Sequence, residues 1–221
     1  HPLRECVKIK MLHQSHLKNK LKQIVLKKCF VFFFLAFISL LLLQFIQQNI
    51  LDLSYNRVFI EKGEYWRLLS GGLVHSNYYH CLINLFGLFC LINLYEYQIT
   101  LRTWATVCLL LVFCVNLSIY LLLPTTSFYL GFSGALHGLY TWTSINAWKE
   151  KRSWFPLVVL LLLIVKLILD TNETNQLSAQ IIGMRVHWQS HWFGLVAGIV
   201  CGICDRNNKG ENIPPSHNNL Q

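Results

Sequence analysis

Residues 129–148 read YLGFSGALHGLYTWTSINAW, a stretch that contains no Asp, Glu, Lys or Arg. Its length matches the roughly 20 residues that a helix needs to cross a bilayer. Ser133 stands four residues into this stretch, and His191 lies in a second apolar stretch near the end of the chain, within SHWFG. A hydroxyl and an imidazole at membrane depth are costly, so each needs a reason to be there. If the two helices touch, Ser133 and His191 form a nucleophile and its base within the bilayer.

The composition of the whole chain indicates a membrane protein. Of its 221 residues, 54% are hydrophobic and only 13% are charged, whereas soluble domains carry roughly 25% charged residues. Several apolar runs approach the length of a membrane span. We therefore expect an all-α polytopic membrane protein, a six-helix bundle without a separate soluble domain.

The apolar runs divide the chain into a basic leader, a membrane domain and a polar tail. The leader covers residues 1–28, the six-helix membrane domain residues 29–204, and the tail residues 205–221, which we expect to be disordered. No cleavable secretory signal is expected in the leader, and Met11 is a candidate start. The six predicted spans are Cys29–Ile46, Tyr78–Tyr97, Thr103–Leu123, Tyr129–Trp148, Trp154–Asp170 and Val186–Cys204.

The distribution of basic residues predicts the orientation. With the N-terminus inside, the inner segments hold 14 Lys and Arg residues and the outer segments hold four, as the positive-inside rule requires. Both termini are therefore expected in the cytoplasm. The net charge of +9 is explained by these short basic loops, so nucleic-acid binding is not expected. The cysteines lie mostly in apolar runs and are interpreted as small buried hydrophobes.

Ser133 and His191 are expected at matching depth, because both spans run inward from the outer face. Gly194 and Gly198 share one helical face with His191, so the face that carries the base is also a face that can pack closely. Gly131 and Gly134 similarly leave the backbone around Ser133 uncrowded. The structural alternatives are a serine bonded back to its own helix and a histidine that links two helices.

Polar residues of the second span supply a candidate oxyanion site. His80 and Asn84 are one helical turn apart near its outer end, and both side chains can donate a hydrogen bond to a developing oxyanion. A polar clamp between helices is the alternative. His75 lies just upstream and is a candidate supporting residue.

His137, one turn after Ser133, is a second candidate base, which we rank below His191 because a nucleophile needs room for substrate between base and oxyanion site. No Asp or Glu is expected at matching depth, so a two-residue dyad is predicted instead of a triad. No metal site and no cofactor are expected.

These motifs together resemble the rhomboid intramembrane serine proteases. They are Trp66-Arg67 in the first outer loop, His80-Cys81-Leu82-Ile83-Asn84, Gly131-Phe132-Ser133-Gly134, and His191 with Gly194 and Gly198. The resemblance implies a six-helix fold, a Ser133–His191 dyad and an oxyanion site formed by His80, Asn84 and the Ser133 amide. Trp66 and Arg67 are expected to anchor the first outer loop. Phe132 is bulkier than the small residue frequent there in many rhomboids.

The longer motif GFSGALHG and the short chain resemble the rhombosortase branch of that family. This implies a bacterial inner-membrane enzyme whose active site faces the periplasm and whose substrates carry a C-terminal tail: a Gly-Gly signature, one transmembrane helix and a basic end. The alternatives are a general rhomboid protease with another single-span substrate, a catalytically silent rhomboid-like protein that binds membrane helices, and a transporter or channel. Polar residues that cluster at one end of the spans disfavour the last.

Overall fold

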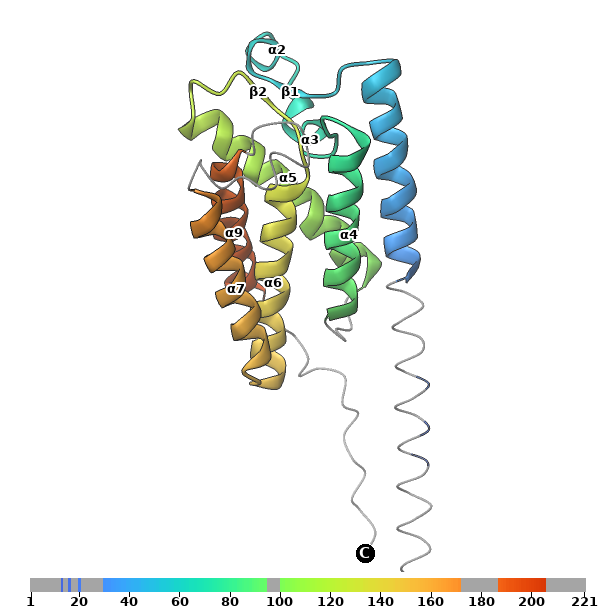
Figure 1. Cartoon of the computed structure of the whole chain (residues 1–221), viewed down its shortest axis with the longest axis vertical. Helices are drawn as coiled ribbons and strands as arrows, with labels where there is room; N and C mark the ends of the chain where they lie inside the picture. Colours follow the sequence, from blue (N-terminus) through green and yellow to red (C-terminus); the bar gives the residue numbers. More distant parts are fainter. Residues whose placement is uncertain are drawn as a thin grey trace, which may run out of the picture.

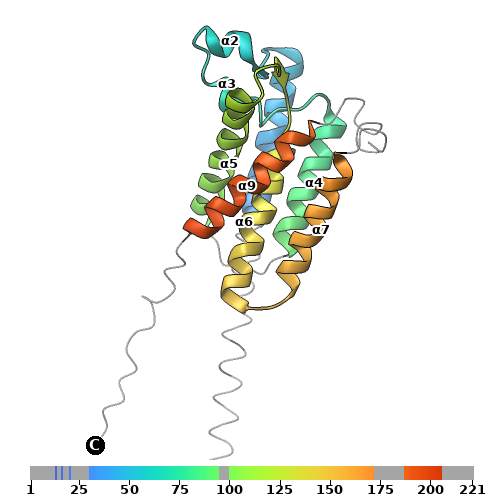
Figure 2. The same cartoon turned by 90° about the vertical axis from the view of Figure 1, so that its left-hand side faces the viewer.

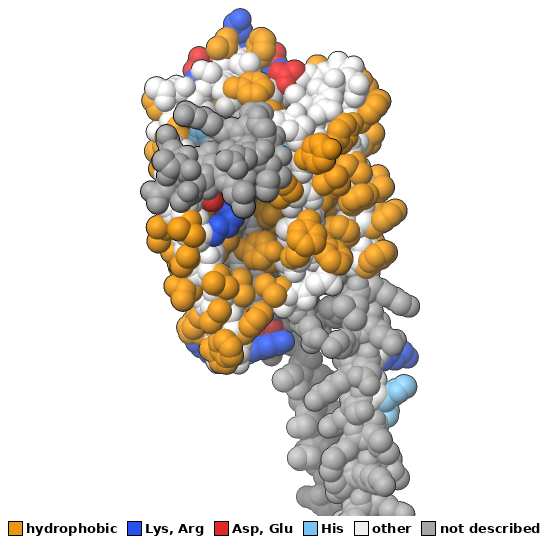
Figure 3. Space-filling view, in the orientation of Figure 1, with side chains coloured by type: hydrophobic (Ala, Val, Ile, Leu, Met, Phe, Trp, Pro, Cys, Tyr) orange, Lys and Arg blue, Asp and Glu red, His pale blue; other side chains and the backbone are white. Residues whose placement is uncertain are grey.

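The computed structural model describes residues 30–94, 100–171 and 187–205, together with residues 13, 16 and 20. The described chain is mostly helical (Figure 1). The predicted basic leader and disordered tail lie outside these residues except for positions 13, 16, 20 and 205. Hydrophobic side chains dominate the helical part of the face in Figure 3.

Six helices in the described part follow the predicted spans. They are the N-terminal helix Phe30–Asn49, α4 (Tyr78–Leu94), α5 (Leu101–Leu122), α6 (Ser133–Lys151), α7 (Phe155–Asp170) and α9 (Trp188–Cys204). Among the described residues, Phe30–Asn49 and Arg102–Leu122 are long and apolar enough to cross a membrane by length and composition, and Tyr78–Leu94 is a shorter apolar helix. The number of six crossings stays a prediction.

The start of the fourth span was predicted wrongly. α6 begins at Ser133, four residues later than expected, because residues 128–132 are not helical. Phe128–Tyr129 forms a short strand, β2, and Gly131 has a φ of +132°, a conformation that interrupts a helix and suits glycine. Ser133 is therefore the first residue of its helix.

The first loop is more ordered than an all-α prediction implies. It contains β1 (Tyr55–Asn56), α2 (Arg57–Glu61) and α3 (Arg67–Ser70). β1 pairs antiparallel with β2, with Tyr55 opposite Tyr129. An all-α protein was expected, and this small sheet is the part of the fold that differs. It forms because buried loop backbone needs hydrogen-bond partners, which the two extended segments supply to each other. The sheet also ties the first loop to the segment that leads into Ser133.

Arg67 holds this loop together from inside. Its side chain is only 5% exposed and donates to the Ser54 carbonyl at 2.8 Å, the Asp52 carbonyl at 3.0 Å and Glu64 Oε2 at 2.7 Å. The Trp66 ring lies against its guanidinium, 4.5 Å from the ring centroid, and is itself 43% exposed. Arg67 therefore links the start of the loop to α3, whereas Trp66 covers it from outside.

We expect Arg67→Ala to lower the free energy of unfolding of the protein in detergent by about 3 kcal/mol. The substitution removes a buried charge and leaves its carbonyl partners unpaired. Thermal unfolding of the purified protein measures this. Lys62→Ala is the matched control: Lys62 is an exposed cation of the same loop, and its removal should leave the melting temperature unchanged. An Arg67→Ala protein that melts like the wild type but loses activity would instead place Arg67 in the substrate site.

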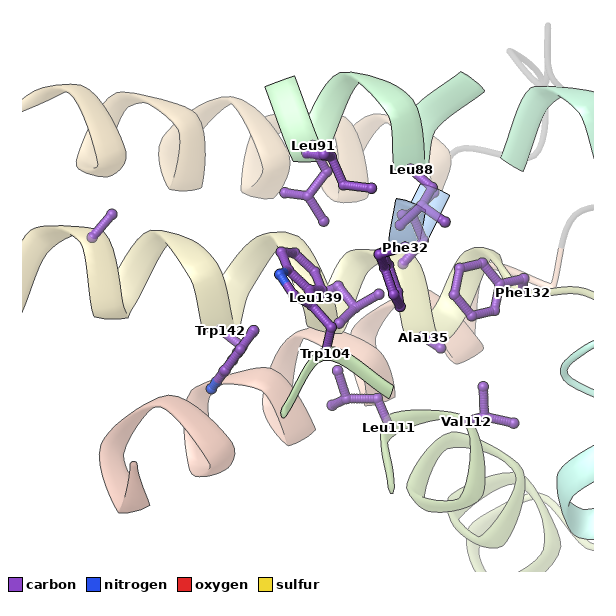
Figure 4. Packing of buried hydrophobic residues seen from close by; sticks show 13 residues of the cluster. Phe32, Leu88, Leu91, Trp104, Leu111, Val112, Phe132, Ala135, Leu139 and Trp142 are labelled. Atoms are coloured by element: carbon purple, nitrogen blue, oxygen red, sulfur yellow. The ribbon is translucent and has the colours of Figure 1, made fainter. Parts of the chain in front are cut away.

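A hydrophobic core joins four of the helices below the loop. Phe32 from the N-terminal helix stacks on Trp104 of α5 at 5.4 Å, and Trp104 meets Trp142 of α6 edge to face at 5.6 Å. Leu88 of α4 and Leu139 of α6 are buried in the same cluster (Figure 4). This core fixes α6, the helix that begins with Ser133, at the centre of the bundle.

Candidate active site

Glycines bring α6 and α9 into backbone contact. A Cβ on Gly194 would overlap the Gly134 carbonyl, and one on Gly198 would overlap the Gly138 carbonyl. The contacts advance along both helices in the same direction, so α6 and α9 have the same chain direction. The two helices cross at an angle (Figure 2). Helices can approach this closely only where neither carries a side chain at the contact. The structure thus places Gly194 and Gly198, the pair expected to pack closely, on Gly134 and Gly138.

This contact places Ser133 beside His191. Ser133 Oγ lies 3.0 Å from His191 Nε2, a hydrogen-bond distance between the first residue of α6 and the first turn of α9. The His191 side chain is buried. The structural alternative for Ser133, a bond from its hydroxyl to its own helix, is not the contact observed. An imidazole in this position can take the hydroxyl proton and activate the oxygen as a nucleophile.

His137 lies beside His191 and not beside the Ser133 hydroxyl. The two imidazole rings stack with centroids 4.2 Å apart and an angle of 15° between their planes. His137 Nδ1 hydrogen-bonds the Ser133 backbone carbonyl at 2.7 Å, which requires its proton to be on Nδ1. His137 therefore packs against one face of the His191 ring, a contact that the sequence analysis did not predict.

An acidic residue lies at the depth of the pair, contrary to the sequence-based expectation. Asp170, the last residue of α7, has Oδ2 3.3 Å from His191 Nδ1 and 2.5 Å from Lys166 Nζ. The signal that could have found it is its place at the end of the predicted span Trp154–Asp170. That span runs opposite to the Ser133 and His191 spans, so it ends at the level where they begin.

The same groups form a candidate cation site, which the sequence analysis did not expect. Ligand atoms of His137, Asp170 and His191 lie within 4.8 Å of one another. However, the two imidazoles are stacked almost in parallel, and a metal binds an imidazole nitrogen in the plane of its ring. Their lone pairs therefore do not converge on one point, and an ion would require one ring to turn.

The segment before Ser133 is held from two sides. Gly131 N donates to the Gly71 carbonyl at 3.2 Å, and Tyr129 Oη donates to the Gly131 carbonyl at 2.9 Å. Phe132 N donates to His75 Nε2 at 3.4 Å. Burial, with a smaller contribution from His80, lowers the pKa of His75 to about 3, so its imidazole stays neutral and can accept this bond. His75 thus supports the backbone that precedes Ser133.

His80 lies next to this segment, and Asn84 follows one helical turn later on α4. The His80 ring packs so closely on Gly131 that a Cβ there would come within 3.0 Å of His80 Cε1. Asn84 is buried, and its side-chain amide donates one hydrogen bond to the His80 carbonyl at 2.9 Å; its second N–H has no acceptor among the described residues. The Ser133 amide lies in the first turn of α6 and has no intrahelical acceptor. Of the two expected side-chain donors, His80 is therefore the one whose ring lies against the segment before Ser133.

The family model described as the Rhomboid domain matches residues 62–208, which is more than half of the chain. The match includes α3, the motif Gly131-Phe132-Ser133-Gly134 and the whole of α9 with His191, Gly194 and Gly198. No curated protein matches the chain. With the apolar helices described above, this match identifies an integral membrane protein that belongs to the rhomboid family.

Proposed function

We propose that this protein is an intramembrane serine endopeptidase in which Ser133 is the nucleophile and His191 the base. The observation that carries the proposal is the 3.0 Å contact between Ser133 Oγ and His191 Nε2. Rhomboid proteins are in general serine proteases that act within the membrane. No cofactor and no metal is part of the proposed reaction.

In the proposed reaction, His191 Nε2 accepts the Ser133 hydroxyl proton while Oγ attacks the carbonyl carbon of the scissile peptide. The negative charge that develops on the carbonyl oxygen is stabilised by the Ser133 amide, the Asn84 amide group and His80. The N-terminus of α6 adds a favourable dipole at this point. His191 then gives its proton to the leaving amine, and water hydrolyses the acyl-enzyme by the same steps in reverse.

The site also suggests where a substrate is cut. Ser133 and His191 each lie at the start of a helix, close to the loop that contains α2 and α3. With the orientation that the basic residues predict, this end faces the periplasm of a bacterial inner membrane and both termini lie in the cytoplasm. The scissile bond would then fall at or just inside the outer end of a single-span substrate's transmembrane helix.

A Gly-Gly pair before the transmembrane helix is a physically sensible target. A peptide carbonyl within a helix is engaged in a backbone hydrogen bond, so the scissile segment must unwind first. Glycine weakens a helix by about 1 kcal/mol relative to alanine. Together with the GFSGALHG motif, this supports the rhombosortase reading: a protease that removes C-terminal Gly-Gly sorting tails from exported proteins.

The test compares cells that express the wild-type protein with cells that express Ser133→Ala. Mass spectrometry of the C-termini of exported proteins with Gly-Gly tails should show processed ends in the wild type and intact tails in the variant. If such tails are removed in both, the sorting-tail specificity is wrong. If a panel of other single-span reporters is cut only by the wild type, a general rhomboid protease remains. Binding of such reporters without any Ser133-dependent cut would indicate a silent rhomboid-like protein.

A further inference from the structure

The contact between α7 and His191 assigns a role to Asp170. Asp170 closes α7, and its Oδ2 faces Nδ1 of the buried His191 ring at 3.3 Å. The opposite nitrogen of the same ring, Nε2, faces Ser133 Oγ at 3.0 Å. Serine, histidine and aspartate thus stand in line across one imidazole, with each side chain contributed by a different helix.

The protonation state of His191 requires an acceptor on the side of Asp170. If Nε2 is to accept the Ser133 proton, the single proton of the neutral ring must be on Nδ1. That nitrogen is buried and has no well-aligned hydrogen-bond partner among the described residues. His137 cannot supply one, because its ring is stacked face to face on His191 and not directed at the ring edge. The Asp170 carboxylate is the acceptor within reach.

The imidazolium that forms during the reaction also needs a counter-charge. When His191 takes the serine proton, a positive charge appears in a buried site. The neighbouring His80 and His137 offer no negative charge to balance it, and Lys166 adds a second positive charge nearby. A carboxylate at the far nitrogen offsets that charge, as the aspartate does in Ser-His-Asp hydrolases. Hydrogen bonds of catalytic groups are often long in the absence of substrate and shorten in the reacting complex.

We propose that Asp170 is a positioning residue for His191, which makes the site a Ser133–His191–Asp170 triad in place of the expected dyad. Its carboxylate holds the proton of His191 on Nδ1, fixes the ring toward Ser133 and stabilises the imidazolium. Lys166, one turn earlier on α7, binds the same oxygen and so shares the carboxylate with His191. This inference rests on the proposed serine protease function.

The competing interpretation is that Asp170 only pairs with Lys166 and stabilises the end of α7. Lys166 is half-exposed, with 48% of its side chain accessible, and such i,i+4 pairs contribute little. Lys166→Met is therefore a matched control. It removes the ion pair but leaves the Asp170 carboxylate for His191, whereas Asp170→Asn keeps the size of the side chain and removes its charge.

The experiment measures labelling of the full-length protein in detergent by a fluorophosphonate, which requires no knowledge of the natural substrate. Ser133 Oγ forms a bond to phosphorus, the P–F bond breaks, fluoride leaves, and His191 accepts the serine proton. The rate constant of inactivation reports the chemical step, and the half-saturating probe concentration reports binding. Thermal unfolding of each variant is measured in parallel.

We expect Asp170→Asn to lower the inactivation rate constant by about 10²-fold, with the half-saturating concentration unchanged. This is less than the about 10⁴-fold effect of a fully committed triad aspartate, because Lys166 shares the carboxylate and His137 still supports the ring. Asp170→Glu, which keeps the charge, should recover part of the rate. Lys166→Met should react at least as fast as the wild type.

Three results would overturn the triad. The first is labelling of Asp170→Asn at the wild-type rate. The second is a loss of both rate and thermal stability in Asp170→Asn and in Lys166→Met, which would show a purely structural ion pair. In either case Ser133-dependent labelling of the wild type would leave the protease function standing. If the wild type shows no labelling that Ser133→Ala removes, the proposed function and the triad both fail.

Discussion

Cleavage of a single-span membrane substrate should disappear in Ser133→Ala and in His191→Ala, while both proteins remain folded. Ser133 Oγ and His191 Nε2 are 3.0 Å apart, so each residue is ineffective without the other. Because such a pair acts as a unit, the double variant should be little worse than either single variant. Cleavage assays with the purified proteins in detergent or liposomes measure this, with thermal unfolding as the check on folding.

Ser144→Ala is the matched control for the serine. Ser144 is a buried serine of the same helix, 11 positions after Ser133 and about 16 Å farther along its axis. Its removal should leave cleavage close to the wild-type level. Cleavage by a folded Ser133→Ala protein would reject Ser133 as the nucleophile. Full activity in His191→Ala would transfer the role of base to His137, which would then have to leave its bond to the Ser133 carbonyl.

Turnover should fall by about 10²–10³-fold in Asn84→Ala, the effect of a single lost oxyanion donor. Asn84 is buried on α4 one turn after His80, whose ring packs on Gly131, and among the described residues its amide donates only to the His80 carbonyl. The charge that it meets develops only during the reaction, so the loss should appear in kcat and much less in substrate binding. Steady-state cleavage of a purified reporter separates the two.

Asn93→Ala provides the control for this change. Asn93 lies on the same helix and donates to the carbonyl four residues earlier, as Asn84 does, but it is exposed. Its removal should not affect kcat. If Asn84→Ala instead unfolds at lower temperature and loses binding and turnover together, the polar clamp that the sequence left open is the correct interpretation. His80→Ala is expected to behave as Asn84→Ala does, with a smaller change in stability.

The helical class and the main pair of the candidate site could be predicted because their signals are local. A run of about 20 apolar residues has few alternatives to a membrane helix, and a histidine on the same face as Gly194 and Gly198 marks the side of the helix that packs. The structure places that face on Gly134 and Gly138. The six crossings, the orientation and the substrate remain predictions of the sequence.

Features that depend on two distant segments could not be predicted. The start of α6 moved from Tyr129 to Ser133 because Tyr129 pairs with Tyr55, a partner more than 70 positions away that no local pattern indicates. The role of His137, which is to stack on the His191 ring, depends on the packing of α9 against α6. Arg67, expected with Trp66 to anchor the first loop, is buried inside that loop and hydrogen-bonds residues 13 to 15 positions earlier in the chain.

By itself, therefore, the sequence determined that this protein is built from apolar helices and that Ser133 and His191 lie on helices with closely packing faces. Both conclusions rest on composition and on spacing along one helix, which are properties of the local chain. Only the tertiary structure decided which groups complete their surroundings. Asp170 lies more than 20 positions from His191 in the chain and 3.3 Å from its Nδ1 in space. Spacing within one helix carries no information on such a contact, because it is set by how α7 and α9 both pack against α6.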